Sequence, residues 1–265
     1  MAYLARIALY PIKSLDGITV SQTTVLPSGA LRCDRTYALF DQQGRFINGK
    51  RNARVHHLRS AFSNDIQTLT LTRQDTQAQV TFHLEQQRPE LEAWLSDYFQ
   101  QPVHLGHNPD QGFPDDTESP GPTVISTATL ETVASWYPEL TLEEVRRRFR
   151  TNLEIAGVPA FWEDQLYGPQ GTQVSFQIGT LQLQGVNPCQ RCVVPVRDTL
   201  TGAATPAFQQ TFMGQRRATL PDWADRSRFN HFYRLAVNTR ASRGQGETAI
   251  NVGDPVYLSS APSDS

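Results

Sequence analysis

The sequence predicts an α+β fold that is mainly β. Many short segments alternate apolar and polar residues with a period of two, and only a few show the spacing of an amphipathic helix. The clearest alternating segments are residues 67–72 and 79–84. A set of short strands with few helices favours barrel-like or folded-sheet β domains over a parallel sheet wound with helices.

Further strands are predicted in the first fifty residues. Apolar positions begin the chain at residues 4–12, and a strand region at residues 18–26 follows the turn at Asp16-Gly17. Residues 36–40 and 45–47 flank a break of the hairpin type. These segments, with the alternating pair, predict an N-terminal β-barrel-like domain.

One helix and one long connection follow. The spacing of Leu91, Leu95 and Phe99 predicts a helix over residues 89–99, which opens with a proline suited to a first helical turn. Residues 106–122 are rich in Gly, Pro and Asp, so they predict a linker or a long surface loop. This places an N-terminal domain at residues 1–105 and a second domain at residues 123–265.

The second domain is expected to mix short strands with a few short helices. Ser126 is a candidate N-cap for one helix, and Thr141-x-x-Glu144 matches a capping box that opens another, up to residue 149. The predicted strands are residues 153–156, 174–178, 181–185, 192–196, 232–237 and 254–258, and a further helical stretch is expected at residues 206–218.

Composition excludes several classes of protein. The 265 residues carry 24 Lys+Arg and 26 Asp+Glu, a formal charge of -2, which gives no reason to expect a nucleic-acid partner. No apolar run approaches the roughly 18–20 residues of a membrane span, and the N-terminus does not resemble a signal peptide. We therefore expect a soluble, cytoplasmic protein with no membrane partner. Three cysteines cannot form a disulfide framework.

Cys189 and Cys192 form a C-x-x-C pair that allows several interpretations. Structural zinc is disfavoured, because Cys33 and the six histidines show no matching spacing, and the His56-His57 pair is expected on the surface or in the core. A thioredoxin-like pair normally begins a helix, whereas the predicted strand at residues 192–196 argues against one. Two small buried hydrophobic side chains remain the plainest alternative.

The residues around the two thiols are more specific than the thiols themselves. Residues 188–202 read Pro-Cys-x-Arg-Cys-x-x-Pro-x-x-Asp-x-x-Thr-Gly, which resembles the signature of the molybdenum cofactor sulfurase C-terminal (MOSC) superfamily. Residues 10–17 and 31–37 resemble the N-terminal β-barrel domain that accompanies MOSC. Residues 148–153 and 252–258 resemble the MOSC domain, a β-barrel domain with a few short helices.

The resemblance implies a molybdenum–pterin cofactor (Mo-molybdopterin) in a cleft between the two domains. Cys192 would be the metal ligand and catalytic residue, since a soft thiolate suits a metal already bound by sulfur, while Cys189 would be structural or form a pocket wall. The cofactor's phosphate and pterin need cations and directional donors. The cofactor-binding residues carried over are Lys13, Ser14, Arg35, Ser126, Arg148, Arg150, Asn152, Gln190 and Arg191.

The implied activity is the reduction of small N-hydroxylated compounds such as hydroxylamines and amidoximes. The chain stops at Ser265 without clustered cysteines for an iron–sulfur centre. Electrons are therefore expected from a separate donor protein of the ferredoxin or flavin reductase type. The alternative is a sulfur-carrier or cofactor-delivery module without turnover of its own. Lys13, Ser14 and Arg35 in the N-terminal domain favour the enzyme.

Overall fold

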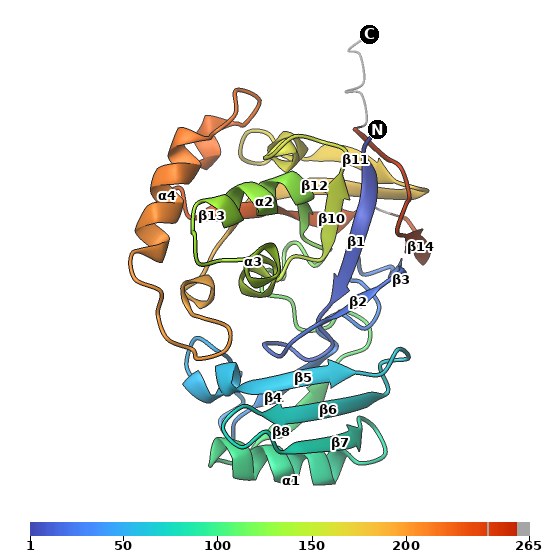
Figure 1. The fold of residues 1–265 in the computed structure, drawn as a ribbon. Coiled ribbons are helices and arrows are strands. Elements are labelled where there is room, and N and C mark those ends of the chain that lie inside the picture. The colour runs from blue at the N-terminus through green and yellow to red at the C-terminus, as the bar shows by residue number, and fades with distance from the viewer. Residues whose placement is uncertain (243, 259–265) are drawn as a thin grey trace.

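The computed structural model, which describes residues 1–242 and 244–258, is built mainly from β-strands (Figure 1). In this part of the chain the strands form one sheet of eight, two sheets of two and one sheet of three. The mainly β fold with a few short helices predicted from the sequence is confirmed. Within these residues no helix has the length and apolar character needed to cross a membrane.

The largest sheet joins the start of the chain to its second half. Its strand order is β15-β11-β12-β13-β9-β10-β1-β2. β1 runs antiparallel to β10, with Tyr3 opposite Ala156 and Ile7 opposite Leu153. The strands are β1 (Tyr3–Leu9), β2 (Ile18–Val20), β9 (Val124–Ser126), β10 (Leu153–Ala156), β11 (Val174–Ile178), β12 (Leu181–Gln190), β13 (Arg234–Ala241) and β15 (Val256–Leu258).

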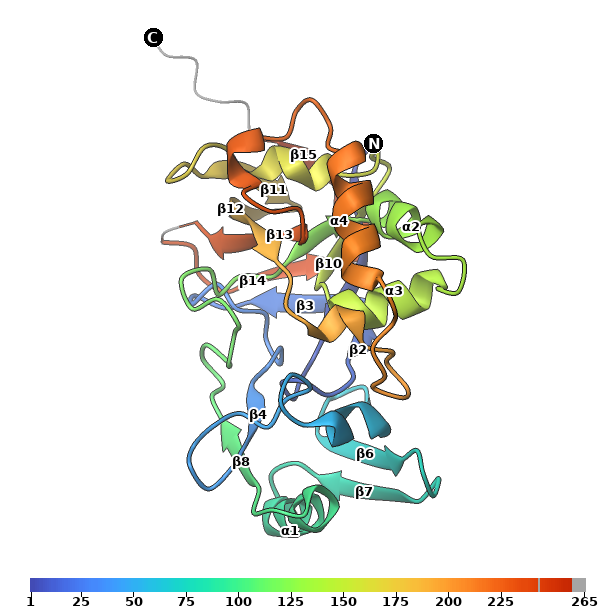
Figure 2. The same cartoon turned by 90° about the vertical axis from the view of Figure 1, so that its left-hand side faces the viewer.

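A smaller layer lies at the other end of the molecule (Figures 1 and 2). It packs the three-stranded sheet and the β4–β8 pair with helix α1 around one apolar core that includes Leu39, Leu71 and Leu95. Its elements are β4 (Tyr37–Phe40), the 3-10 helix η1 (Ala53–His57), β5 (Leu58–Phe62), β6 (Thr68–Arg73), β7 (Gln79–His83), α1 (Arg88–Phe99) and β8 (His104–His107).

Ladder pairing crosses the predicted boundary at residues 106–122. Besides the β1–β10 pair, β3 (Gln22–Val25) pairs with β14 (Thr248–Asn251). The division into residues 1–105 and 123–265 stays a prediction. The first strands of the chain nevertheless complete sheets whose other members come from the second half.

Three helices, α2 (Thr127–Ser135), α3 (Leu142–Phe149) and α4 (Phe208–Ala218), pack together against the large sheet. β9 shows the alternation that places them: Val124 belongs to the core of the sheet and Ile125 to the core under the helices. Both predicted N-caps are confirmed. The Ser126 hydroxyl accepts from the Thr129 N–H at 3.0 Å, and the Thr141 hydroxyl accepts from the Glu144 N–H at 3.2 Å.

The strand predicted at residues 192–196 is wrong. β12 ends at Gln190, and the next element is the 3-10 turn η3 (Val194–Val196). Pro195 has no N–H for a ladder and its fixed φ suits a helical turn. The Val196 N–H closes the turn on the Val193 carbonyl at 3.1 Å. The chain therefore folds sharply immediately after Cys192.

A buried polar cluster lies beneath α2, next to the 3-10 helix η2 (Trp162–Leu166). Glu163 is 1% exposed; its Oε2 accepts from the Ser126 N–H at 3.1 Å and from the Thr129 hydroxyl at 3.0 Å, while its Oε1 has no partner. Burial, reinforced by the neighbouring Asp164, raises the pKa of Glu163 to about 7. Arg216 forms an ion pair with Asp164. Ser126 thus supports the α2 terminus.

Glu163 makes stability depend on pH. In the unfolded chain its carboxyl ionises near 4.5, whereas the folded protein retains the proton up to about pH 7. Between these values the folded state binds more protons, so the free energy of unfolding falls as pH rises, by up to about 1.4 kcal/mol per pH unit. We expect Glu163→Gln to remove this part of the slope in urea unfolding measured from pH 5 to pH 8.

The matched control is Glu139→Gln at an exposed carboxylate, which should leave the slope unchanged. Equal slopes in the wild type and in Glu163→Gln would show that Glu163 is ionised throughout this range.

Candidate functional site

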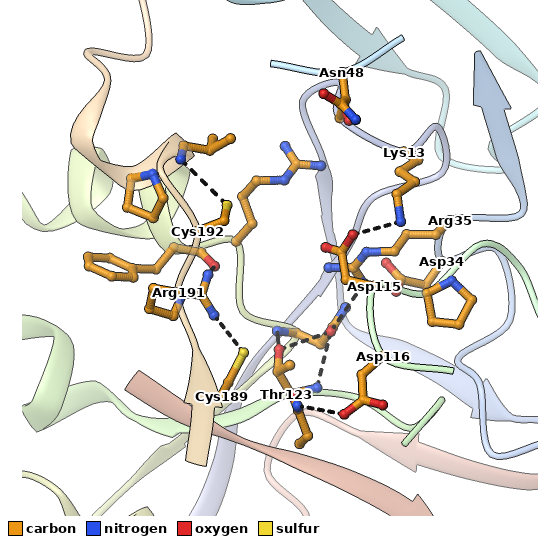
Figure 3. A pocket seen from close by; sticks show the side chains of 18 of the residues that line it. Lys13, Asp34, Arg35, Asn48, Asp115, Asp116, Thr123, Cys189, Arg191 and Cys192 are labelled. Carbon is orange, nitrogen blue, oxygen red and sulfur yellow. Dashed lines mark hydrogen bonds and ion pairs between the residues drawn. The ribbon is translucent and has the colours of Figure 1, made fainter. Parts of the chain in front are cut away.

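A cavity of about 570 Å³ collects residues from the start of the chain, from the loop at residues 109–123 and from the C-x-x-C segment. Figure 3 shows Cys189, Arg191 and Cys192 on one side of it, opposite Lys13, Arg35 and Asp115. Of the site residues predicted from the sequence, those that line the cavity are Lys13, Ser14, Arg35, Arg148, Arg150, Asn152, Gln190, Arg191 and Cys192. Ser126 lies outside the cavity wall, buried in the cluster under α2.

The cavity is far more basic than the chain as a whole. Its lining contains eleven Lys and Arg residues and four Asp residues, although the formal charge of the whole chain is -2. Partly enclosed walls of one sign concentrate the electrostatic potential and attract anions. The cavity is therefore suited to an anionic ligand, a property that net charge alone concealed.

Lys13 closes one part of the cavity together with the loop predicted as a linker. Its ammonium donates to the Phe113 carbonyl at 2.8 Å, forms an ion pair with Asp115 at 2.7 Å and lies 4.9 Å from the centre of the Phe46 ring. Although burial opposes it, the ammonium lowers the pKa of Asp115 to about 2. The loop is thus a wall of the site as well as a connection.

Arg35 and Arg150 both lie against the ring of Tyr10. Their guanidinium carbons are 5.3 and 4.2 Å from its centre. Arg35 is neutralised by an ion pair with Asp34. Arg150 has no such partner among the described residues; its Nη2 is buried without a hydrogen bond, and burial followed by repulsion from Arg35 lowers its pKa. Arg150 therefore presents an unsatisfied positive charge at the cavity.

Three predicted site residues occupy the left-handed backbone region. The φ angles are 76° at Ser14, 53° at Arg35 and 52° at Arg150. Residues other than glycine adopt this region at a cost, and such strain is concentrated at functional sites. Arg150 has this conformation because it ends helix α3 as its C-cap. The cap turns its side chain from the helix into the cavity wall.

Asn152, predicted as a cofactor-binding residue, uses both groups of its side-chain amide within the protein. Its Nδ2 donates to the Ala8 carbonyl at 3.1 Å, and its Oδ1 accepts from the Thr123 N–H at 3.2 Å and from the Thr123 hydroxyl at 3.1 Å. Arg35 also donates to Oδ1 at 3.4 Å. The side chain is consumed by the protein, so its role is to hold three segments of the wall together.

Arg148 is similarly engaged within the protein. Its Nη1 donates to the Pro195 carbonyl at 3.1 Å and to the Thr205 hydroxyl at 2.9 Å, and its Nε donates to Glu144 at 3.3 Å. Only 3% of the residue is exposed. Because Pro195 belongs to the turn after Cys192, Arg148 fixes the position of that turn relative to α3.

The two thiols differ in their surroundings. The Cys189 sulfur accepts from Arg191 Nη1 at 3.2 Å, and the same guanidinium donates to the Phe149 carbonyl. Among residues 1–242 and 244–258, the Cys192 sulfur accepts only a long contact from the Val194 N–H, at 3.5 Å. Cys189 is therefore already paired with a cation, whereas Cys192 keeps its electron pairs available at the cavity.

Several buried donors around the cavity lack partners. Within the described part of the chain, these guanidinium donors are Nη2 of Arg150 and the Nε groups of Arg191, Arg197 and Arg234. A buried donor that makes no hydrogen bond costs free energy. A ligand with acceptor oxygens would recover that cost by bonding to it. Among residues 1–242 and 244–258 no three His, Cys, Asp or Glu side chains are grouped to hold a metal. A metal at Cys192 would thus need most of its ligands from an organic cofactor.

Sequence reasoning did not place His56, Arg197, Arg228 or Arg234 at the site, yet all four line the cavity. His56 was expected on the surface or in the core. Its Nε2 lies 3.1 Å from the Gly49 carbonyl, and burial lowers its pKa. No local motif marks these residues, because their meeting depends on the pairing of distant strands. Only the family motifs could point to the site.

Comparison with known protein families matches two family models to the chain. The model of the MOSC N-terminal beta barrel domain matches residues 1–102, and the model of the MOSC domain matches residues 121–257. No curated protein matches the chain. The two family models together cover most of the sequence, and the MOSC match includes both thiols of the cavity. The chain therefore belongs to the MOSC family, whose domains are associated with the molybdenum cofactor.

Proposed function

We propose that this protein is a molybdenum-cofactor-binding oxidoreductase that reduces N-hydroxylated compounds of the hydroxylamine or amidoxime type. The observation that carries the proposal is the basic cavity with a free thiol in its wall, within a chain of the MOSC family. A cofactor with a phosphate and a metal bound by sulfur has the charge and the ligand chemistry that such a cavity accepts.

The residues present fit this cofactor. The orphaned donors of Arg150 and Arg191 would be satisfied by its acceptor atoms, and Ser14 also lines the cavity. Lys13 and Arg35 would face the cofactor from the side opposite the thiols as donors that are already paired with Asp115 and Asp34. Cys192 would hold the metal, since its sulfur has no hydrogen bond to a cation in the part of the chain that the structure describes. Asn152 and Arg148 would act by fixing the wall.

The reaction breaks the N–O bond of the substrate. A hydroxylamine or amidoxime takes up two electrons and two protons and leaves as the amine or amidine, with one water molecule released. The bound cofactor would supply the two-electron chemistry. The protein would orient the substrate and concentrate anionic groups near Cys192 by its excess of Lys and Arg side chains.

Electrons would come from outside this chain. An iron–sulfur cluster commonly takes four cysteine ligands, whereas the chain has three cysteines, one of which is assigned to the metal. We propose a separate donor protein of the ferredoxin or flavin reductase type.

The metal assignment predicts different outcomes for the two thiols. Protein from a host that makes the pterin cofactor should contain about one molybdenum per chain, following one-thiolate ligation. Cys192→Ser should lose the metal and Cys189→Ser should largely keep it, as measured by metal analysis of purified, folded protein. The reverse result would exchange the roles of the two cysteines. No metal in the wild type, from a host that loads another molybdoenzyme, would contradict the proposal.

The reaction assignment predicts activity with an artificial electron donor. Wild-type protein should reduce a hydroxylamine or benzamidoxime. The measurement is the amount of amine or amidine product, determined by chromatography. The Cys192→Ser variant should fall to background, at least a hundredfold lower, because it lacks the metal ligand. Activity that survived this substitution would rule out chemistry at Cys192. Loaded protein that turns over neither substrate would favour a cofactor-delivery role.

A further inference from the structure

A second basic part of the cavity wall remains unassigned. It consists of Arg228, the last residue of the 3-10 helix η4 (Arg226–Arg228), and Arg234, the first residue of β13. Arg234 stands opposite Gln190 in the β12–β13 ladder and its Nη1 donates to the Pro188 carbonyl at 3.0 Å. This Arg228–Arg234 corner therefore lies beside Cys189, on the same wall as the thiols.

The two arginines are held by neutral acceptors. Arg228 donates to the Gly168 carbonyl at 2.8 Å and to the Val186 carbonyl at 3.4 Å. Arg234 donates to Pro188 and, at 2.9 Å, to the Asn230 side chain. Within the described residues neither reaches a carboxylate, whereas Lys13 and Arg35 have Asp115 and Asp34. The guanidinium groups are positioned while their charges stay uncompensated.

The corner carries an electrostatic cost in the absence of a ligand. Burial lowers the pKa of Arg234, and the neighbouring Arg228 lowers it further. The Nε of Arg234 is also buried, with no hydrogen-bond partner in the described ranges 1–242 and 244–258. Two like charges fixed close together bind an anion with little loss of side-chain freedom, because the protein has already ordered them.

Asn187 adds a directed donor to this corner. Its Oδ1 accepts from Asn238 Nδ2 at 3.0 Å, and the same Nδ2 donates to Asp116 at 3.2 Å. This contact fixes the Asn187 amide, and its Nδ2 makes no hydrogen bond within the described residues. Asn187 lines the cavity with the two arginines. The corner thus offers two guanidinium groups and one amide N–H group to a ligand.

We propose that the Arg228–Arg234 corner binds an anionic group of the substrate, so that the preferred N-hydroxylated compounds carry a carboxylate or a phosphate-like group. This inference rests on the proposed reductase function and names its substrate class. Of the residues assigned to the cofactor, Gln190 stands next to the corner, opposite Arg234 in the β12–β13 ladder, whereas Lys13 and Arg35 lie on the other side of the cavity. The corner would set KM for the charged substrate through contacts that a neutral substrate cannot make.

The test compares benzamidoxime with its 4-carboxylate and 4-phosphonate in molybdenum-loaded protein. Wild type should show a kcat/KM at least tenfold higher for one or both charged compounds than for neutral benzamidoxime. Comparing the carboxylate with the phosphonate identifies the preferred anion. Arg234→Gln and Arg228→Gln should each lose about tenfold or more of that preference, as expected for a hydrogen bond to a charged group. The neutral compound should lose less kcat/KM than the charged compounds do, so that the ratio of the two values falls.

The control is Arg226→Gln, an exposed arginine of the same turn whose side chain is 74% exposed, which should leave all rates unchanged. Two corner variants are tested because one of them could fail to fold. A melting temperature far below that of the wild type would identify such a variant. Loss of molybdenum in either folded corner variant would assign the corner to the cofactor and overturn the inference. Equal kcat/KM for neutral and charged compounds in the wild type would also overturn it.

A binding measurement separates this inference from the reaction. Calorimetry should show that 4-carboxybenzamidine or its phosphonate analogue binds loaded wild type at least tenfold more tightly than benzamidine, and that Arg234→Gln removes the difference. If no amidoxime is reduced but this preference is present, the proposed reaction fails and the anion site stands. If no preference is present, the anion site is refuted whatever the activity.

Discussion

The site depends on one buried amide. Asn152 exchanges hydrogen bonds with the Ala8 backbone through its own carbonyl and its Nδ2, at 2.7 and 3.1 Å, and accepts two more from Thr123. It thereby connects β1, β10 and the end of the loop that walls the cavity. Arg35 reaches the same oxygen. Because a buried amide left unpaired is costly, this joint holds the Arg35 guanidinium in the wall and anchors the backbone two residues after Arg150.

A rigid joint of this kind explains how an acidic chain sustains a basic cavity. Like charges repel, so a group of arginines opens unless backbone and hydrogen bonds oppose it. Ser14, Arg35 and Arg150 are held in left-handed backbone conformations, and Arg148 is bonded to two segments at once. The strain and the repulsion are offset by packing elsewhere. A ligand with negative charge would relieve part of that repulsion, which is the physical basis for expecting one.

Local signals predicted the elements better than the site. The caps at Ser126 and Thr141 are written in short sequence patterns, and both helices begin where expected. The strand assigned to residues 192–196 failed because two valines outweighed Pro195, whose missing N–H and contact with Arg148 favour a turn. The family motifs identified nine lining residues. Arg228 and Arg234 lay beyond sequence reasoning, since only the β12–β13 ladder and the η4 turn bring them to Cys189.

The asymmetry of the two thiols follows from the same turn. β12 carries Cys189 beside a guanidinium, whereas the chain bends after Cys192 and leaves its sulfur with a single backbone contact from the described residues. A cation beside a thiolate competes with a metal for its electron pairs, so the sulfur without one is the better ligand. Arg191, placed between them in sequence, bonds toward Cys189 and Phe149. Arg191 thus hydrogen-bonds to Cys189 and does not bond to Cys192. This difference is a physical reason for an arginine between the two cysteines of the motif.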